Sequence, residues 1–310
     1  MHCGLSLPRV RGMTSPTMRL ALALSVVLPA ASFAAPPKKA GGPADPPMAG
    51  KGPVAKTPGV CGAKVFPLVE GNEWTYGAVT SIAPLADNDP RKKMAPAQPK
   101  TVVITVKSIA AGKGAADTVV TLEEKVTTEI GNQPNGKPPV IDERTVTSTI
   151  TCNSKGKFEV SPDSFFFAGE PGGTLGLKVD NIERKHDTSW KLTNGGIGDA
   201  TWREEIVAQW SRTATAGSEA KLGSGKLELE HTFTPQQPEL IITKIGQYRA
   251  EKVGLLTTGR VTLDGALQLT AQQELPAGWL STIWLADGIG IVQVLNAFAH
   301  QYQLVDAKLK

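Results

Sequence analysis

The sequence has few residues of the types that most enzymes and metal sites use. Its 310 residues include four histidines, three cysteines and three tyrosines. It contains no H-E-x-x-H or C-x-x-C pair, no G-x-S-x-G nucleophile turn and no glycine-rich phosphate loop before a helix. Glu204 and Glu205 are adjacent in an expected strand, where neighbouring side chains point to opposite faces and cannot form an acid–base pair. We therefore expect no enzymatic activity, no cofactor and no metal site.

Acidic residues are absent from the first 34 positions, which contain Arg9, Arg11 and Arg19. The apolar run that follows, residues 20–28, is too short to cross a bilayer but has the length of a signal-peptide core. Small residues at Ser32 and Ala34 occupy the two positions that define a cleavage site. We predict that residues 1–34 are a signal peptide, with a retained membrane anchor as the alternative.

Large apolar side chains are scarce in residues 35–60, which are rich in Pro, Gly, Ala and Lys. Such a segment cannot bury enough surface to offset the entropy of ordering, so we predict a disordered tether. The tether and the signal segment each carry a net charge of +3, and the whole chain carries +4. Residues 61–310 therefore carry −2, and we expect no nucleic-acid surface on them.

Cysteine is absent from the position where a lipoprotein signal requires it. Cys3 lies too early in the chain, and Cys61 follows no apolar run. The mature protein is therefore expected to have neither a lipid anchor nor a transmembrane anchor. In the periplasm or outside the cell, Cys61 and Cys152 are more often bridged than free. We predict a disulfide between them, and two unpaired buried thiols are the alternative.

Residues 61–310 show the two-residue alternation of strands, whereas segments with the period of a helix are nearly absent. The pattern predicts one all-β domain, either a single strongly curved antiparallel sheet or an open half-barrel of about ten strands. We expect strand runs at 74–80, 101–109, 118–130, 140–152, 157–167, 201–210, 226–233, 240–256 and 261–270, then a hairpin at 284–292 and a run at 302–309. One short helix is expected within 296–302, and the inserts at 85–100 and 162–198 are expected as surface loops or partial lids.

The hairpin at 284–292 contains the dipeptide Asp287-Gly288, which favours a two-residue turn because both residues adopt positive φ at low cost. Gly290 lies inside the returning strand, where a missing side chain marks a bulge or a close approach by another group. We expect Trp284 to lie over Gly290.

Three short motifs follow one another along the domain in a fixed order. They are P-L-x-x-G-x-x-W-x-Y with Gly71, Trp74 and Tyr76, G-x-[YF]-x-A-x-x-V with Gly246 and Tyr248, and W-x-x-x-G-x-G-x-V with Trp284, Gly288 and Gly290. In this order the motifs resemble those of a loose group of uncharacterised secreted or periplasmic bacterial β-domain proteins. The resemblance implies an all-β organisation similar to the half-barrel of lipoprotein carriers, but it implies no agreed activity.

Aromatic residues and one histidine form the candidate ligand site. His231 alternates with Leu229 and Phe233 on the apolar face of its expected strand. Together with Trp202, Trp210 and Trp284, His231 and Phe233 are candidates to line a cavity on the concave side of the sheet. The alternative is that the indoles fill the interior and that His231 is a core residue bonded to a hydroxyl or a carbonyl.

Two functions follow from these observations. The first is a non-catalytic envelope or periplasmic module that has a structural role or binds a protein or polysaccharide. The second is a carrier of a hydrophobic molecule such as a lipid or acyl chain. The successive residues Phe165, Phe166 and Phe167 cannot all face one side of a strand, so at least one is expected to be exposed or in a loop. A continuous apolar cavity would favour the carrier, and a filled interior would favour the module.

Overall fold

The computed structural model describes residues 52–62, 64–89, 97–114, 116–131, 138–168, 177–184, 192–193, 196–198, 200–212, 224–264 and 273–310. The predicted signal peptide and the predicted tether up to residue 51 lie outside these ranges. Within them, no helix has the length and apolar character needed to span a membrane.

The described ranges contain fourteen strands, one 3₁₀ turn and one short α-helix. In chain order they are η1 (Val60–Gly62), β1 (Glu73–Val79), β2 (Pro99–Ala111), β3 (Thr118–Ile130), β4 (Val140–Cys152), β5 (Phe158–Val160), α2 (Phe165–Ala168), β6 (Leu177–Arg184), β7 (Leu192–Thr193), β8 (Gly196–Ile197), β9 (Trp202–Arg212), β10 (Ser224–Thr243), β11 (Gly246–Asp264), β12 (Gln273–Ala286), β13 (Gly290–Leu295) and β14 (Gln301–Lys308).

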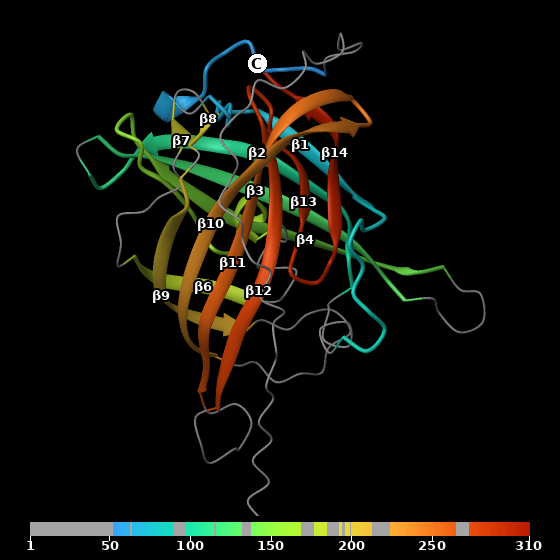
Figure 1. Ribbon diagram of the computed structural model, residues 1–310. Helices are drawn as coiled ribbons and strands as arrows, with labels where there is room; N and C mark the ends of the chain where they lie inside the picture. The colour runs from blue at the N-terminus through green and yellow to red at the C-terminus, as the bar shows by residue number, and fades with distance from the viewer. Residues whose placement is uncertain are drawn as a thin grey trace, which may run out of the picture. The chain divides into compact units, whose positions relative to one another are not determined.

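Twelve of the strands form one antiparallel sheet in the order β5-β4-β3-β2-β1-β14-β13-β12-β11-β10-β9-β6. The strands β7 and β8 pair separately. At the centre of the order, the first strand pairs with the last, since β1 lies between β2 and β14. Figure 1 shows the curvature of this sheet, and in the described residues the end strands β5 and β6 share no ladder. The prediction of one curved, open all-β sheet is confirmed, with twelve strands instead of about ten.

The hairpin of β10 and β11 is longer than the sequence pattern indicated. These strands have 20 and 19 residues. The predicted strand run at 240–256 is wrong, because the chain reverses between Thr243 and Gly246. The ladder is interrupted by a bulge between Gln236 and Glu239, after which the far ends of both strands arch over the sheet (Figure 1). At this arch, Gln303 of β14 donates a hydrogen bond of 2.8 Å to Ile242 O.

Two local predictions about helices are wrong. The strand expected at 157–167 ends at Val160, and residues 165–168 form α2 instead. No helix forms at 296–302, because the side chain of Asn296 accepts hydrogen bonds of 3.0 Å from the backbone N–H groups of Phe298 and His300. This local turn competes with helix formation, and β14 begins at Gln301.

The insert at 162–198 also differs from the expected surface loop. It contains α2, the edge strand β6 of the main sheet and the β7–β8 pair. Its Phe165 and Phe166 are fully buried. Contacts to distant strands, which local sequence patterns do not encode, draw this insert into the domain.

The final hairpin has a three-residue loop instead of the expected two-residue turn, since Ala286 pairs with Gly290. Gly290 has φ 94°, and a Cβ atom there would lie 3.6 Å from the Phe66 ring and 3.8 Å from Trp74 Nε1. The group beside Gly290 is therefore Trp74 and not Trp284. The Trp74 indole N–H donates to Ile289 O at 2.6 Å, and this bond holds the ring against the loop.

The same contact joins the first and third sequence motifs in space. Trp74 reaches the hairpin loop, and the hydroxyl of Tyr76 donates a 3.0 Å hydrogen bond to Ile291 O on β13. Both aromatic side chains are fully buried. The conformations of Gly71 (φ 85°) and Gly288 (φ 70°) are left-handed, which favours glycine at these two motif positions.

The start of the domain is held to the sheet in two ways. A disulfide joins Cys61 to Cys152, whose Cα atoms are 5.8 Å apart, and Cys152 lies on the buried face of β4. Before it, Ala55 N donates to Gly288 O at 2.8 Å, and Tyr248 OH donates to Pro53 O at 3.2 Å. The residues that contact the sheet therefore begin before Cys61, within the segment that we assigned to the tether.

Candidate functional site

The hollow of the curved sheet is occupied by α2. Phe165 contacts the rings of Tyr76 on β1 and Tyr302 on β14, with centroids 4.5 and 5.7 Å apart. Two residues later, Phe167 contacts His231 on β10 at 4.7 Å. Because β1 and β10 are separated by four strands in the sheet order, α2 must lie inside the curve.

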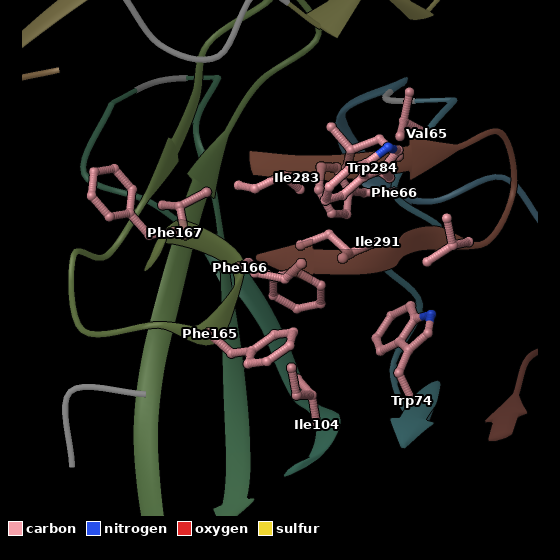
Figure 2. Packing of buried hydrophobic residues seen from close by; sticks show 14 of the residues in the cluster. Val65, Phe66, Trp74, Ile104, Phe165, Phe166, Phe167, Ile283, Trp284 and Ile291 are labelled. Carbon is pink, nitrogen blue, oxygen red and sulfur yellow. The ribbon is translucent and has the colours of Figure 1, made fainter. Parts of the chain in front are cut away.

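In Figure 2, Phe165 and Phe166 are directed toward Ile104 and Ile291, whereas Phe167 points away from them. All three rings are buried and all three residues lie in α2, so the expectation that at least one is exposed or in a loop is wrong. The reason is the local backbone: one turn of helix directs successive side chains around its axis, and here every direction meets the sheet. Apolar volume that a hydrophobic ligand would need is therefore taken by the chain itself.

One fully buried carboxylate, Glu124 of β3, holds the start of α2. Its two oxygens accept hydrogen bonds from Ser148 Oγ at 2.6 Å, Ser164 Oγ at 2.7 Å and Phe165 N at 2.9 Å. Burial raises the pKa of Glu124 to about 7, although these three hydrogen bonds act in the opposite direction. Glu124 was not among the predicted site residues, but the sequence contains a signal for it: a lone carboxylate at an inward position of β3, between Leu122 and Val126.

Three of the predicted cavity residues come together on the inner face of β9 and β10. The rings of Trp202 and Phe233 are stacked, with centroids 4.9 Å apart and an interplanar angle of 4°. His231 lies 6.4 Å from the Phe233 ring, and its Nδ1 is 2.9 Å from Thr257 Oγ1 on β11. Burial, followed by the positive charge of Arg184, lowers the pKa of His231 to about 3, so its ring is neutral.

An ion pair between a buried carboxylate and a partly buried cation lies beside this aromatic cluster. Glu204 on β9 is the cross-strand partner of His231, and it pairs with Arg184 on β6. Arg184 also donates a 2.8 Å hydrogen bond to Val160 O on β5, and its Nε lies 3.9 Å from Glu159. Side chains of Arg184 and Glu159 thus bridge the two ends of the twelve-stranded sheet, where the described backbone forms no ladder.

A small cleft of about 350 Å³ lies on the outer side of this bridge. Its walls come from β4, β5 and β6 and the residue after β5, and most of them are polar. The lining residues are Thr149, Thr151, Glu159, Ser161, Ile182 and Arg184.

A larger groove of about 930 Å³ crosses β6, β9, β10 and β11. Its charged groups are largely paired, since Glu228 contacts Lys226 at 2.5 Å and Arg260 at 3.0 Å. Trp210 lies at this groove, and its Nε1 donates to Thr262 O at 3.1 Å. Most of the lining is polar. Its carboxylates, amides and hydroxyls belong to Asp180, Asn181, Glu183, Gln209, Ser211, Ser224, Glu228 and Thr262, its cations are Lys226 and Arg260, and the other lining residues are Val207, Ala208, Trp210 and Gly225.

The fifth predicted cavity residue, Trp284, lies elsewhere. Its Nε1 donates to Glu239 at 2.9 Å, and Lys252 Nζ lies 5.2 Å from the centroid of its ring. The five candidates are thus divided between the inner cluster (Trp202, His231, Phe233), the polar groove (Trp210) and the arch of β10 and β11 (Trp284). In the described part of the chain, no three His, Cys, Asp or Glu residues are grouped so that they could hold a metal ion.

No protein-family model and no curated protein matches this chain. Two solved structures are similar to it at low identity. One is a putative lipoprotein from Parabacteroides distasonis, with 13% identity, a TM-score of 0.42, and coverage of 79% of this chain and 99% of the other. The second is a putative exported protein with a YmcC-like fold from Bacteroides fragilis, with 14% identity, a TM-score of 0.41 and the same coverage.

Proposed function

We propose that the chain is an exported, non-catalytic binding module of the bacterial cell envelope, and that its ligand is an envelope polysaccharide. Export is supported by the signal-like composition of residues 1–34 and by the Cys61–Cys152 bridge, which is typical of oxidising compartments. The periplasm and the cell surface both satisfy these conditions.

The observation that carries the proposal is the character of the larger groove. A polysaccharide presents many hydroxyls, each of which donates and accepts hydrogen bonds, and the groove offers matching carboxylate, amide and hydroxyl groups. Its cations Lys226 and Arg260 are already paired with Glu228. The groove therefore suits an uncharged, hydroxyl-rich ligand better than a strongly anionic one.

The alternative, a carrier of lipids or acyl chains, has less support. An acyl chain needs a continuous apolar cavity, and the hollow of the sheet is filled by the rings of Phe165, Phe166 and Phe167. Both recesses described above have mostly polar linings. A filled interior with polar surface recesses favours a module that binds its partner on the outside.

The test is calorimetric titration of the mature protein with soluble glycan fragments released from the cell wall of the native host. Gln209→Ala and Asp180→Ala each remove a polar group from the groove, and we expect each to weaken binding about tenfold, the value of one hydrogen bond of about 1.4 kcal/mol. Glu143→Ala, an exposed change on β4 at a distance along the sheet, is the matched control.

Four results would contradict the proposal. Absence of binding to any glycan fragment would do so, as would equal weakening by the groove variants and by the Glu143 control. Tight binding of a fluorescent fatty acid would instead favour the carrier. A stable complex with an envelope protein, unaffected by both groove variants, would show that the binding surface lies outside the groove.

A further inference from the structure

Two buried side-chain nitrogen atoms in the described residues have no hydrogen-bond partner, and they belong to Trp202 and His231. Trp202 is 4% exposed and His231 is 1% exposed. Buried polar groups are almost always bonded, so each exception requires an explanation. The exception is specific, because the indole N–H groups of Trp74, Trp210 and Trp284 all have acceptors.

The two unpaired atoms belong to neighbouring side chains. In the ladder of β9 and β10, Trp202 is opposite Phe233 and His231 is opposite Glu204. Trp202 and His231 are therefore diagonal neighbours on the inner face, a spacing of about 7–8 Å that long side chains bridge. Both rings also flank the ring of Phe233. The two unpaired nitrogen atoms thus come from side chains that pack against the same ring.

The tautomer of His231 decides whether both nitrogens are donors. When the Thr257 hydroxyl donates to Nδ1 across the 2.9 Å contact, the ring proton lies on Nε2. In that arrangement Trp202 Nε1–H and His231 Nε2–H are two donors without acceptors. Their partner must be an oxygen that has lone pairs to share.

We propose that Trp202 and His231 bind a small uncharged molecule through one accepting oxygen, and that this molecule enters from the cleft between β5 and β6. The neighbouring charges already neutralise one another, since Glu204 pairs with Arg184, and so the pair of donors favours a neutral carbonyl or hydroxyl over a carboxylate. The cleft, at about 350 Å³, is at the small end of ligand pockets.

Arg184 controls the entry. It lines the cleft on one side and pairs with the buried Glu204 on the other, next to His231 in the ladder. A molecule that passes from the cleft to the donors must displace this guanidinium or slide beside it. The site shares no residue with the polysaccharide groove, so its test is independent of the test of the function proposed above.

The experiment is a ¹H–¹⁵N NMR titration of the full chain with acetamide, N-methylacetamide and glycerol at millimolar concentrations. We expect at least one probe to shift the Trp202 indole N–H resonance with saturation. The indole resonances of Trp74, Trp210 and Trp284, whose N–H groups are bonded within the protein, should stay in place. Trp202→Phe removes the responding resonance and thereby assigns it.

A pair of surface variants tests the route of entry. Thr149→Trp fills the mouth of the cleft at an exposed position, and we expect it to weaken probe binding at least tenfold. Thr147→Trp introduces the same side chain two residues away on the same outward face, outside the cleft, and should leave binding unchanged. Equal effects of the two variants would refute entry through the cleft.

The site itself is refuted by two outcomes. In the first, no probe shifts the Trp202 resonance, and a long-lived cross-peak between its indole proton and water identifies the acceptor as a buried water only. In the second, all indole resonances shift together in proportion to probe concentration, which indicates a solvent effect without a site.

Discussion

Two carboxylates on the inner face of the sheet are buried to nearly the same degree, yet they are stabilised in different ways. Glu124 on β3 is surrounded by neutral donors, namely two serine hydroxyls and one backbone N–H. Glu204 on β9 is paired with a cation, Arg184, which comes from the edge strand β6. A buried acid can therefore be stabilised either by hydrogen bonds from neutral donors or by an ion pair with a cation.

The two solutions have different structural consequences. The neutral donors around Glu124 belong partly to α2, so this acid holds the helix that fills the hollow. Arg184, which pairs with Glu204, also contacts Val160 O and Glu159. Through Arg184, Glu204 therefore helps to join the two ends of the sheet. Groups that face Glu124 include Tyr76, whose pKa is raised by burial and by this carboxylate, and Asp163, whose charge raises the pKa of Glu124.

The largest effect is expected where a charge loses its partner. Arg184→Met leaves Glu204 buried and unpaired, and should lower the free energy of unfolding by about 3–5 kcal/mol in urea titrations. The double variant Arg184→Met with Glu204→Leu removes both charges and should regain most of that loss. If Arg184→Met alone stays within about 1 kcal/mol of the wild type, the ion pair does not stabilise Glu204 as described.

The next effect distinguishes the two acids by pH. The native pKa of Glu124 is about 7 and its ordinary value is 4.5. At pH values between 4.5 and 7, Glu124 is protonated in the native state and ionised in the unfolded state. Its contribution to stability is therefore complete below pH 4.5 and disappears as the pH rises through 7, a change of about 3 kcal/mol. Glu124→Gln should lack this dependence when free energies of unfolding are measured across the range.

The matched control for this pH series is Glu123→Gln, which changes the adjacent residue on the outward face of β3, where Glu123 pairs with Lys107. The difference between wild type and Glu124→Gln should vary with pH between 4.5 and 7, and it should do so more steeply than the difference between wild type and the control. Parallel curves for all three proteins would mean that Glu124 titrates as it does in the unfolded chain.

A smaller effect tests the neutral donors around Glu124. Ser148→Ala removes the 2.6 Å hydrogen bond to Glu124 and leaves the backbone ladder of β4 in place. We expect a loss of about 1–2 kcal/mol in chemical denaturation, because the carboxylate keeps two of its three donors. Thr147→Ala, which faces outward one position earlier, should cost no more than about 0.5 kcal/mol. Equal losses from both changes would contradict a specific role for Ser148.

The smallest effect is expected at an exposed carboxylate, Glu239, which accepts hydrogen bonds from Lys252 and Trp284. The Lys252 hydrogen bond is the main cause of its lowered pKa. Lys252→Met removes this ion pair and the contact of Lys252 with the Trp284 ring, and should cost less than about 1 kcal/mol by thermal denaturation. A loss as large as that of Arg184→Met would show that burial does not set the scale of these effects.

Much of the fold was predictable because it rests on local alternation. The bounds predicted for β3 and β4, 118–130 and 140–152, are those of the structure. The predicted partner of Cys61, Cys152, is the last residue of β4 and is buried, and the disulfide forms there. Strand propensity and turn residues act over a few positions, so both can be read directly from the sequence.

The candidate site was predictable only in part. Alternation put His231 and Phe233 on one inner face, and Trp202 joined them because β9 pairs with β10 in a particular register. Trp210 and Trp284 are tryptophans like Trp202, but they lie outside that cluster. The partner of Gly290 was predicted as Trp284, a near neighbour in sequence, whereas Trp74 lies there, more than 200 residues away. A contact between residues so far apart along the chain produces no recognisable pattern in the sequence.

By itself, the sequence determined the class of fold, the composition of the N-terminal segments and the faces of the regular strands, since each depends on residues that are close along the chain. Only the tertiary structure decided that α2 fills the hollow and that Arg184 meets Glu204 and Glu159. A four-residue helix has too few turns to produce a periodic signal, and its stability comes from Glu124, a residue more than forty positions earlier. Contacts at such separations depend on how the whole sheet curves, because the curvature brings β3, β5, β6 and β10 within reach of one another.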